Sequence, residues 1–281
     1  MTVARIIELL SAVPVVEPKL ASGRWYVATD GHREITIARG SFVELLISDC
    51  HSSEQGILDI VMEEGAQLRV VHVVESEGSR SSVNLRIARN ASCRMTEVIV
   101  VGAEDRLSVD LVEDGANFEH SGLFIFTNEE RGGVEVLVRH NSPNCTSHTS
   151  MRGVASGSAR GSFKGLVYVA PDAQKTDSVQ SSKNIVIGDA KISTEPQLEI
   201  YADDVKCSHG ATVGQLNEDA LFYMQQRGIS HAEARQLLMR AFVGEVIDEV
   251  GLEALRDRLH HLVEKRFRGE LGKCGECSVC K

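Results

Sequence analysis

A short turn motif recurs at a fixed distance through the strand-rich part of this chain, and this repeat restricts the fold more than any other feature. The motif occupies residues 64–67, 89–92 and 114–117, in steps of 25 residues, and each copy stands between two strand-like segments. Residues 171–173 and 188–190 resemble further copies with less regular spacing. A turn that returns at about one coil length predicts stacked, similar units, as in a β-solenoid.

The segments between these turns have the composition of strands. From about residue 34 to residue 206, β-branched residues dominate, apolar and polar residues often alternate, and Gly, Asn or Asp separates the runs. Typical runs are residues 35–37, 42–47, 57–61, 68–74, 83–87, 95–100, 107–112, 122–126 and 134–138. We therefore expect a mainly β protein with a β-helix core over residues 34–214. A β-sandwich is the alternative, because it also contains many short strands.

The pattern becomes helical in the C-terminal part, where residues 215–270 are expected to form an α-helical region. Asn217 can cap a first helix, and Gly228 can end it. Ser230 and Glu233 have the spacing of a capping box, which predicts the start of a second helix.

The second and third of these helices are expected to be amphipathic. The second has an apolar face at helical spacing, which is made of Ala234, Leu237, Leu238, Ala241, Phe242 and Val246. Gly251 breaks this helix, and a third helix with apolar residues on one side runs to about residue 268. Amphipathic helices at the end of a domain can serve as a face for a partner.

The two ends of the chain carry different signals. Residues 1–33 read as a short amphipathic helix and a lead-in to the strands, because a glutamate interrupts the first apolar segment and no signal-peptide cleavage site is evident. Residues 271–281 form a cysteine-rich tail. No apolar run approaches the roughly 20 residues that cross a bilayer. We therefore expect a cytoplasmic protein with no membrane partner, whose seven cysteines are reduced.

Net charge and missing motifs argue against several functions. The 281 residues carry a net charge of -10, whereas a general nucleic-acid-binding protein needs a basic face. Neither G-x-x-x-x-G-K-[ST] nor G-x-G-x-x-G occurs, so the chain itself is expected to bind no nucleotide. The nucleophile elbow G-x-S-x-G is also absent, which weakens the case for an ordinary hydrolase.

Cys207 and His209 are candidate metal ligands where the strand-like sequence gives way to helical sequence. Residues two apart on a strand project from the same face, and a thiolate with an imidazole suits iron or zinc. The alternative is a buried thiol beside a hydrogen-bonded histidine. Two ligands do not complete a site, so the others must come from elsewhere in the fold or from another chain. Asp203 and Asp204 point to opposite faces, so at most one of them joins the pair.

Two further groups contain possible ligands. Cys274, Cys277 and Cys280 form C-x-x-C-x-x-C, and three thiols at this spacing can hold a metal ion or cluster. A loose tail of reduced thiols is the alternative for this segment. Residues 140–148 include two histidines and a cysteine around a strong turn signal, and a structural role at a corner is favoured there over metal binding.

Three segments resemble the SufB/SufD family of iron–sulfur cluster assembly proteins. They are residues 172–177, residues 191–214 and residues 221–229. The similarity is most specific from about residue 140 to residue 250. Residues 207–212, Cys-Ser-His-Gly-Ala-Thr, resemble SufD more than SufB.

The resemblance implies a right-handed parallel β-helix followed by helices, in a non-catalytic scaffold subunit. The implied partners are a SufB-like paralogue and a SufC-like ABC ATPase that docks on the helical region. His209, with Cys207 beside it, would contribute to a transient iron–sulfur cluster shared with the SufB-like subunit. The apolar helix residues expected to bind a partner are Leu221, Phe222, Leu237, Leu238, Phe242 and Val246. An isolated chain could form a homodimer through the surface meant for the SufB-like subunit.

Two other functions stay open, and two features depart from the family. A structural adapter would hold both partners without ligating a cluster, whereas a carbohydrate-active β-helix enzyme would need exposed carboxylates along a groove. Little sequence precedes the strands, which puts in question any family role of a longer N-terminal region, including stabilisation of a reduced flavin. The C-x-x-C-x-x-C tail is not a general family feature.

Overall fold

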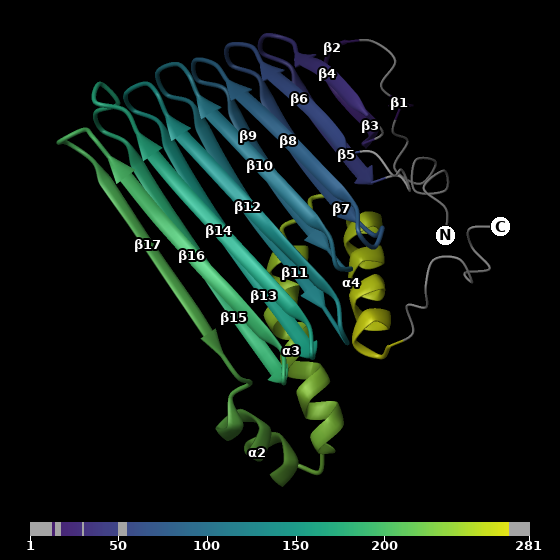
Figure 1. The fold of residues 1–281 in the computed structure, drawn as a ribbon. Coiled ribbons are helices and arrows are strands. Elements are labelled where there is room, and N and C mark those ends of the chain that lie inside the picture. The colour runs from purple at the N-terminus through teal and green to yellow at the C-terminus, as the bar shows by residue number, and fades with distance from the viewer. Residues whose placement is uncertain (1–12, 15–17, 30, 50–54, 270–281) are drawn as a thin grey trace.

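The computed structural model describes residues 13–14, 18–29, 31–49 and 55–269 and shows a protein built mainly of strands. Two parallel sheets lie against each other, and three helices follow them in the chain (Figure 1). The first sheet consists, in spatial order, of β1 (Val13–Pro14), β3 (Gly23–Thr29), β5 (Phe42–Asp49), β7 (Gln67–Val74), β9 (Ser92–Ile99), β11 (Asn117–Phe126), β13 (Thr146–Gly157), β15 (Asp177–Gly188) and β17 (Lys206–Gly214). The second consists of β2 (Lys19–Leu20), β4 (His32–Ile37), β6 (Gly56–Met62), β8 (Arg80–Ile87), β10 (Glu104–Leu111), β12 (Arg131–His140), β14 (Arg160–Val169) and β16 (Lys191–Ile200).

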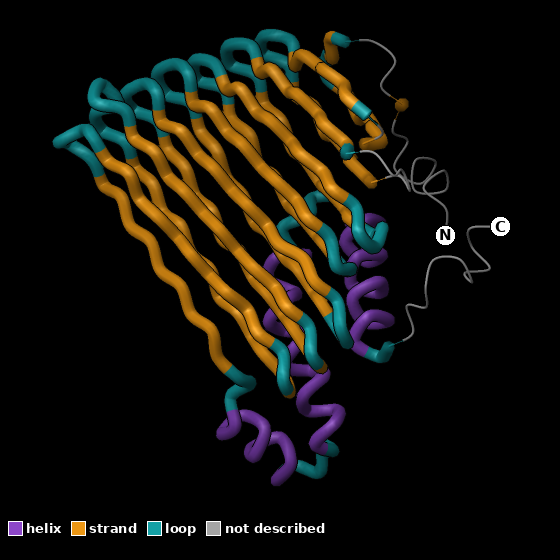
Figure 2. Tube along the Cα trace, viewed as in Figure 1, coloured by secondary structure: helices purple, strands orange, loops and turns teal. Residues whose placement is uncertain are grey.

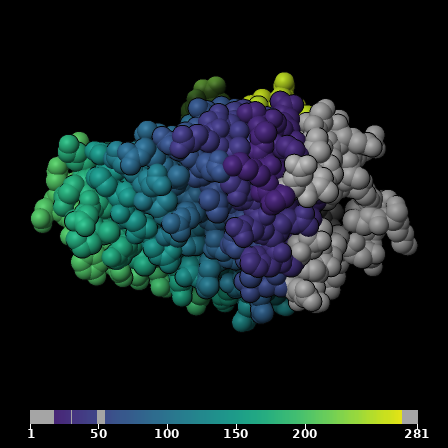
Figure 3. All heavy atoms as spheres, turned by 90° about the horizontal axis from the view of Figure 1, so that it is seen from above, coloured from purple at the N-terminus to yellow at the C-terminus, as the bar shows by residue number. Residues whose placement is uncertain are grey.

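Consecutive strands alternate between the two sheets, and the paired strands are parallel. The chain therefore winds as a parallel β-solenoid, in which each coil adds one strand to each sheet (Figure 2). Parallel pairing excludes a β-sandwich, whose sheets are antiparallel, and confirms the predicted solenoid. The coils follow one another in one direction, so the first and the last coils lie at opposite ends of the molecule (Figure 3).

One row of corners explains the repeat of 25 residues. At these corners the chain leaves the second sheet and enters the first, and one residue in each corner from that between β4 and β5 to that between β14 and β15 has a positive φ. These residues are Gly40, Gly65, Asn90, Gly115, Asn144 and Lys175. Each N–H donates a hydrogen bond to a carbonyl of the next coil, as from Gly65 to Arg89 at 2.9 Å. Glycine and asparagine tolerate this left-handed conformation best, which explains the recurring motif.

The later corners depart from the alignment suggested by the sequence. Coils lengthen toward the C-terminus, because Gln67 pairs with Ser92 whereas Thr146 pairs with Asp177. Residues 171–173 do lie in the same row of corners as the earlier copies. Residues 188–190 instead lie in the opposite row, where the chain passes from the first sheet to the second, so they are not a copy of the same turn.

The solenoid also begins earlier than residue 34. Residues Lys19–Leu20 and Gly23–Thr29 already pair with the next strands of their sheets. The last strand ends at Gly214. The short helix expected near the N-terminus and the cysteine-rich tail fall mainly in residues 1–12 and 270–281, outside the described residues.

The interior of the solenoid changes in character along its length. In the earlier and middle coils the inward side chains are mostly Val, Leu, Ile and Phe, and the largest of them are fully buried. On β15 the buried inward residues are polar instead: Ser178, Gln180, Ser182 and Asn184. The polar part of the interior therefore lies at the end of the solenoid that β17 closes.

Three helices follow β17, namely α2 (Glu218–Gln226), α3 (His231–Ile247) and α4 (Glu253–Phe267). The predicted caps are confirmed, because Asn217 Oδ1 accepts the Ala220 N–H at 2.9 Å and Ser230 Oγ accepts the Glu233 N–H at 3.2 Å. Among the described residues, each helix is too short or too polar to cross a bilayer.

Helices α3 and α4 cover the outer face of the first sheet (Figure 1). Their buried residues join outward-facing side chains of β3 to β13 in a second apolar cluster. Arg152 on β13 fixes α3 to the sheet: its guanidinium lies 4.9 Å from the centre of the Phe242 ring, donates to the Phe242 carbonyl at 3.1 Å and pairs with Glu245. The helical region is thus attached to the solenoid along one face.

Candidate functional site

Cys207 and His209 lie on β17, the last strand of the first sheet. β17 pairs with β15, so that Cys207 stands beside Ser178 and His209 beside Gln180. Since Ser178 and Gln180 are buried inside the solenoid, both candidate side chains also face the interior. Cys207 is half-buried at the edge of a small apolar cluster, whereas His209 is exposed. The thiol and the imidazole therefore share one face of the strand.

A row of hydrogen-bonded side chains leads to the position beside Cys207. His140 Nε2 lies 2.8 Å from Ser147 Oγ, and Ser147 Oγ lies 2.8 Å from Ser178 Oγ. All three residues are buried. Burial lowers the pKa of His140 to about 4, so its ring is neutral at neutral pH. The row ends at Ser178 on β15, the strand that pairs with β17.

The surroundings of Cys207 favour the protonated thiol. Burial raises the pKa of Cys207, and the charge of Asp177 raises it further, against a smaller opposing effect of a hydrogen bond with the Ser178 backbone. The thiolate is the form that ligates metal. A cation that binds Cys207 must therefore displace its proton, which couples binding to pH.

The coil that carries these residues is the open end of the solenoid. Within the described residues, β17 pairs only with β15, and β16 pairs only with β14. Tyr201 and Val213 are 60% and 45% exposed there, and Ile200 is 38% exposed. An unpaired strand edge beside exposed apolar side chains is a surface that another protein can extend by strand pairing.

Asp203 and Asp204 do not join the pair. They lie in the corner before β17, where the Asp204 N–H donates to Gln174 Oε1 at 2.8 Å and the Asp204 carbonyl accepts the Lys175 N–H at 2.6 Å. Asp203 is exposed. These contacts use backbone atoms of Asp204 and hold the corner before β17 against the preceding coil.

The other candidate ligands are dispersed. His140 faces the interior, whereas His148 is exposed on the opposite face of its strand from the inward Ser147. Cys145 is buried in a corner, where its Sγ lies 3.3 Å from the Glu113 carbonyl. This arrangement fits the structural role expected for residues 140–148. Cys274, Cys277 and Cys280 lie outside the described residues.

The structure divides the six helix residues that were expected to bind a partner. Leu221 and Val246 are buried within the chain, and Leu238 and Phe242 are partly buried by the same packing. The apolar sides of α2 and α3 pack on each other and on the first sheet, which buries these four side chains wholly or in part. Contact of the six residues with a partner stays a prediction. Phe222 and Leu237 remain exposed, at 62% and 40%, together with Tyr223 at 57%.

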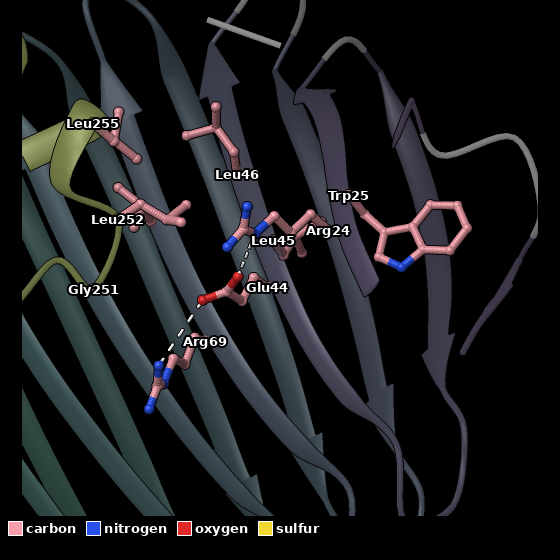
Figure 4. A pocket seen from close by; sticks show the side chains of 10 residues that line it. Arg24, Trp25, Glu44, Leu45, Leu46, Arg69, Gly251, Leu252 and Leu255 are labelled. Atoms are coloured by element: carbon pink, nitrogen blue, oxygen red, sulfur yellow. Dashed lines mark hydrogen bonds and ion pairs between the residues drawn. The ribbon is translucent and has the colours of Figure 1, made fainter. Parts of the chain in front are cut away.

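A small pocket lies toward the other end of the solenoid, between the outer face of β3, β5 and β7 and the start of α4 (Figure 4). Its walls include Leu46, Leu252 and Leu255. Its main charges pair with each other, since Glu44 lies 2.7 Å from Arg24 and 3.9 Å from Arg69. Because the pocket lies on β3, β5 and β7, it is separate from Cys207 and His209 on β17.

Sequence reasoning did not identify Ser147, Ser178 and Gln180 as neighbours of the candidate ligands. Each lies one or two coils away in the chain, and the coil length is not constant, so linear spacing does not align them. The available signal was the alternation of polar residues at 178, 180 and 182, in a strand whose inward positions would ordinarily be apolar.

Comparison with known proteins places this arrangement in a family. Residues 20–242 match the family model described as SUF system FeS cluster assembly, SufBD core domain. The chain is 33% identical over 189 residues to the iron–sulfur cluster assembly protein SufD of Escherichia coli, covering 66% of this chain and 45% of that protein. It is 30% identical over 260 residues to a SufBD family protein of Synechocystis, covering 89% and 57%.

The chain spans about half the length of these curated relatives. The matched region contains both sheets, the strand with Cys207 and His209, and the helices up to residue 242 in α3. The chain therefore belongs to the SufBD family of SUF-system iron–sulfur cluster assembly proteins.

Proposed function

We propose that this protein is a non-catalytic scaffold subunit that contributes His209 and Cys207 to an iron–sulfur cluster assembled with a second, SufB-like subunit. The observation that carries the proposal is the position of the two side chains. They share the inner face of a terminal strand that has one edge without a strand partner within the described residues, in a protein of the SUF system. A thiolate and an imidazole are ligands for iron.

The open end supports a site that is completed by another chain. Protein-bound clusters take about four ligands, and this strand offers two. The free edge of β17 can pair with a strand of a SufB-like subunit, which would bring further ligands next to His209. Exposed Tyr201 and Val213 would be covered in the same step. The cluster is then cargo that is held between two subunits and passed on.

A second surface fits a SufC-like ATPase. Phe222 and Tyr223 on α2 and Leu237 on α3 are large apolar side chains with much of their area exposed. Such groups on a helical surface are typical of a docking site. α2 begins four residues after β17 ends, so a movement of the docked ATPase would reach the strand that carries Cys207 and His209.

The proposal is tested in a complex purified with SufB-like and SufC-like partners. We expect His209→Ala to lower the rate of cluster formation from iron and sulfide while both partners still co-purify. We expect Phe222→Ser combined with Leu237→Ser to weaken retention of the ATPase. The matched controls are His148→Ala, an exposed histidine on another strand, and Phe42→Ser, an exposed phenylalanine at the other end.

An unchanged rate of cluster formation in His209→Ala would contradict the role of His209. The structural adapter is the second candidate, and partly buried Cys207 is the observation that favours it. If a Cys207→Ala, His209→Ala double variant assembles the same amount of cluster in an intact complex, the chain is an adapter that ligates nothing at this end.

A further inference from the structure

Four ionisable side chains lie together inside the solenoid, away from the open end. They are His72 on β7, Glu97 on β9, Asp105 on β10 and His120 on β11, and none is more than 3% exposed. Their strands otherwise bury apolar side chains, such as Met95 and Ile99 on either side of Glu97. Burying charge in such surroundings is costly unless the charge is compensated.

The register of the coils brings these side chains together. His72 pairs with Glu97, and Glu97 pairs with Gly122 on the next coil. Gly122 has no side chain, and a Cβ there would meet the His120 ring at 3.1 Å and Met151 more closely. The ring of His120 uses this space and places Nε2 3.5 Å from Glu97 Oε2. The glycine therefore makes room for a second imidazole beside the carboxylate.

The hydrogen bonds of this cluster are incomplete. Among the described residues, neither oxygen of Glu97 and neither ring nitrogen of His120 has a hydrogen-bond partner. Asp105 Oδ2 has none either, while the other oxygen of Asp105 accepts a hydrogen bond from Ser81. A buried polar atom without a partner has lost its hydrogen bonds to water and gained none in return, which destabilises the folded state. Several such atoms in one place therefore favour a bound group that interacts with them.

The two carboxylates also oppose each other. Burial and the charge of Glu97 raise the pKa of Asp105. Burial by itself would raise the pKa of Glu97, but the contacts with His120 and His72 hold it below its usual value. A cation among the four groups would remove this conflict, because two carboxylates balance two positive charges and the imidazoles can stay neutral.

The distances among His72, Glu97 and Asp105 suit ligands around one ion, and His120 lies next to Glu97. His72 Nδ1 lies 3.4 Å from Glu97 Oε1 and 4.0 Å from Asp105 Oδ1, and ligand atoms of these three residues all lie within 4.8 Å of one another. Two atoms bound to a tetrahedral ion at about 2.1 Å are roughly 3.4 Å apart. Two imidazoles with two carboxylates suit zinc or ferrous iron, whereas magnesium and calcium prefer oxygen ligands alone.

We propose that His72, Glu97, Asp105 and His120 form a binding site for one divalent first-row transition-metal ion. The site joins the first sheet, through β7, β9 and β11, to the second, through β10. The ion acts as an internal clamp and is distinct from the cluster proposed at Cys207 and His209. Because its ligands are fully buried, the ion enters during folding or local opening and exchanges slowly.

The test uses the full chain carrying Cys274→Ser, Cys277→Ser and Cys280→Ser, so that the tail thiols bind nothing. The protein is refolded with Zn²⁺ or, without oxygen, with Fe²⁺, and is then dialysed against a chelator. We expect about one ion per chain to remain, and a higher Tm than after refolding without metal. The two arms identify which ion the site prefers. With Co²⁺ as the probe, the visible spectrum should show nitrogen and oxygen ligation without thiolate charge-transfer bands.

Glu97→Gln keeps the size of the side chain and removes its charge. We expect this variant to lose metal retention by about tenfold or more, since even outer partners of metal ligands are worth roughly 10–100-fold in affinity. Its Tm should no longer respond to the ion. A Cys207→Ala, His209→Ala variant is the control and should keep the ion. If the parent chain retains no ion in either arm, or if Glu97→Gln retains it equally, the proposal is wrong. Should Glu97→Gln fail to fold, the ion count and the Co²⁺ spectrum of the parent chain still decide.

Discussion

Burial separates the histidines of this chain into different chemical roles. His72 and His120 lie beside buried carboxylates, and His140 lies at the start of a hydrogen-bonded row of serines. His209 and His148 are exposed on strand faces. The same side chain therefore serves as an internal polar contact in some coils and as an accessible ligand in the last one.

His140 should make the stability of the protein depend on pH. Its pKa is about 4 in the folded protein, against about 6.5 in the unfolded chain, because burial disfavours the charged ring. The unfolded chain therefore takes up a proton first as the pH falls. The contribution of the neutral His140 ring to the free energy of unfolding is fully present above about pH 6.5. It is lost progressively as the pH falls to about 4.

We expect urea unfolding to show this loss. The free energy of unfolding should fall in both proteins between about pH 7.5 and about pH 5. The fall should be about 2 kcal/mol smaller in His140→Asn than in the unmodified protein, because the variant has no imidazole to protonate at this position. An equal loss in the two proteins over this pH range would show that His140 does not titrate as its burial requires.

At the scale of the elements, the corners determine how successive coils turn and stack. The N–H of each residue with positive φ bonds to the next coil, so the corner sets both the turn and the stacking. Lys175 has the same conformation without the tolerance of glycine or asparagine, which shows that the stacking contacts can impose it.

Gly65→Ala should therefore cost about 1–2 kcal/mol of unfolding free energy. A Cβ at Gly65 would meet no atom within 4 Å, so the cost comes from the positive φ alone. Gly210 on β17 also has open space around its Cβ but has no positive φ, which makes Gly210→Ala the control. We expect the control to leave stability unchanged or slightly higher. Equal effects of the two substitutions in chemical denaturation would contradict the assigned role of the corner.

At the scale of the whole molecule, apolar burial and strand pairing decrease from the middle of the solenoid to its C-terminal end. Coils in the middle bury Val, Ile and Phe side chains between paired strands. The last coil buries few apolar groups, and in the part of the chain that the structure describes one edge of it has no strand partner. The helices reinforce the outer face of β3 to β13. The end with the candidate ligands is thus the least supported part of the solenoid.

Hydrogen exchange should follow this gradient. The amides of β17 that point away from β15 lack a strand partner within the described residues, and the strand has little apolar cover, so they should exchange many times faster than those of β9. β9 is the internal reference because it has a partner on both sides. Similar protection of the two strands in the isolated protein would show that something covers the open end, such as a second copy of the chain.

The sequence was a good guide to the elements and a weaker guide to their contacts. The repeated Gly and Asn corners predicted coils, and the caps at Asn217 and Ser230 predicted two helix starts, because each depends on a few neighbouring residues. The burial of Leu221 and Val246 within the chain could not be read from the sequence, since an apolar stripe has the same pattern whether it packs on a partner or on the chain's own elements.

The sequence by itself determined the solenoid, its C-terminal helices and the shared face of Cys207 and His209, because these follow from local periodicity and from residues two apart on a strand. Only the tertiary structure decided what surrounds those residues. The row from His140 to Ser178 and the cluster of His72, Glu97, Asp105 and His120 join residues from different coils. Coil length varies along the chain, so the neighbours of each inward side chain are set by the register between strands and not by distance in the sequence.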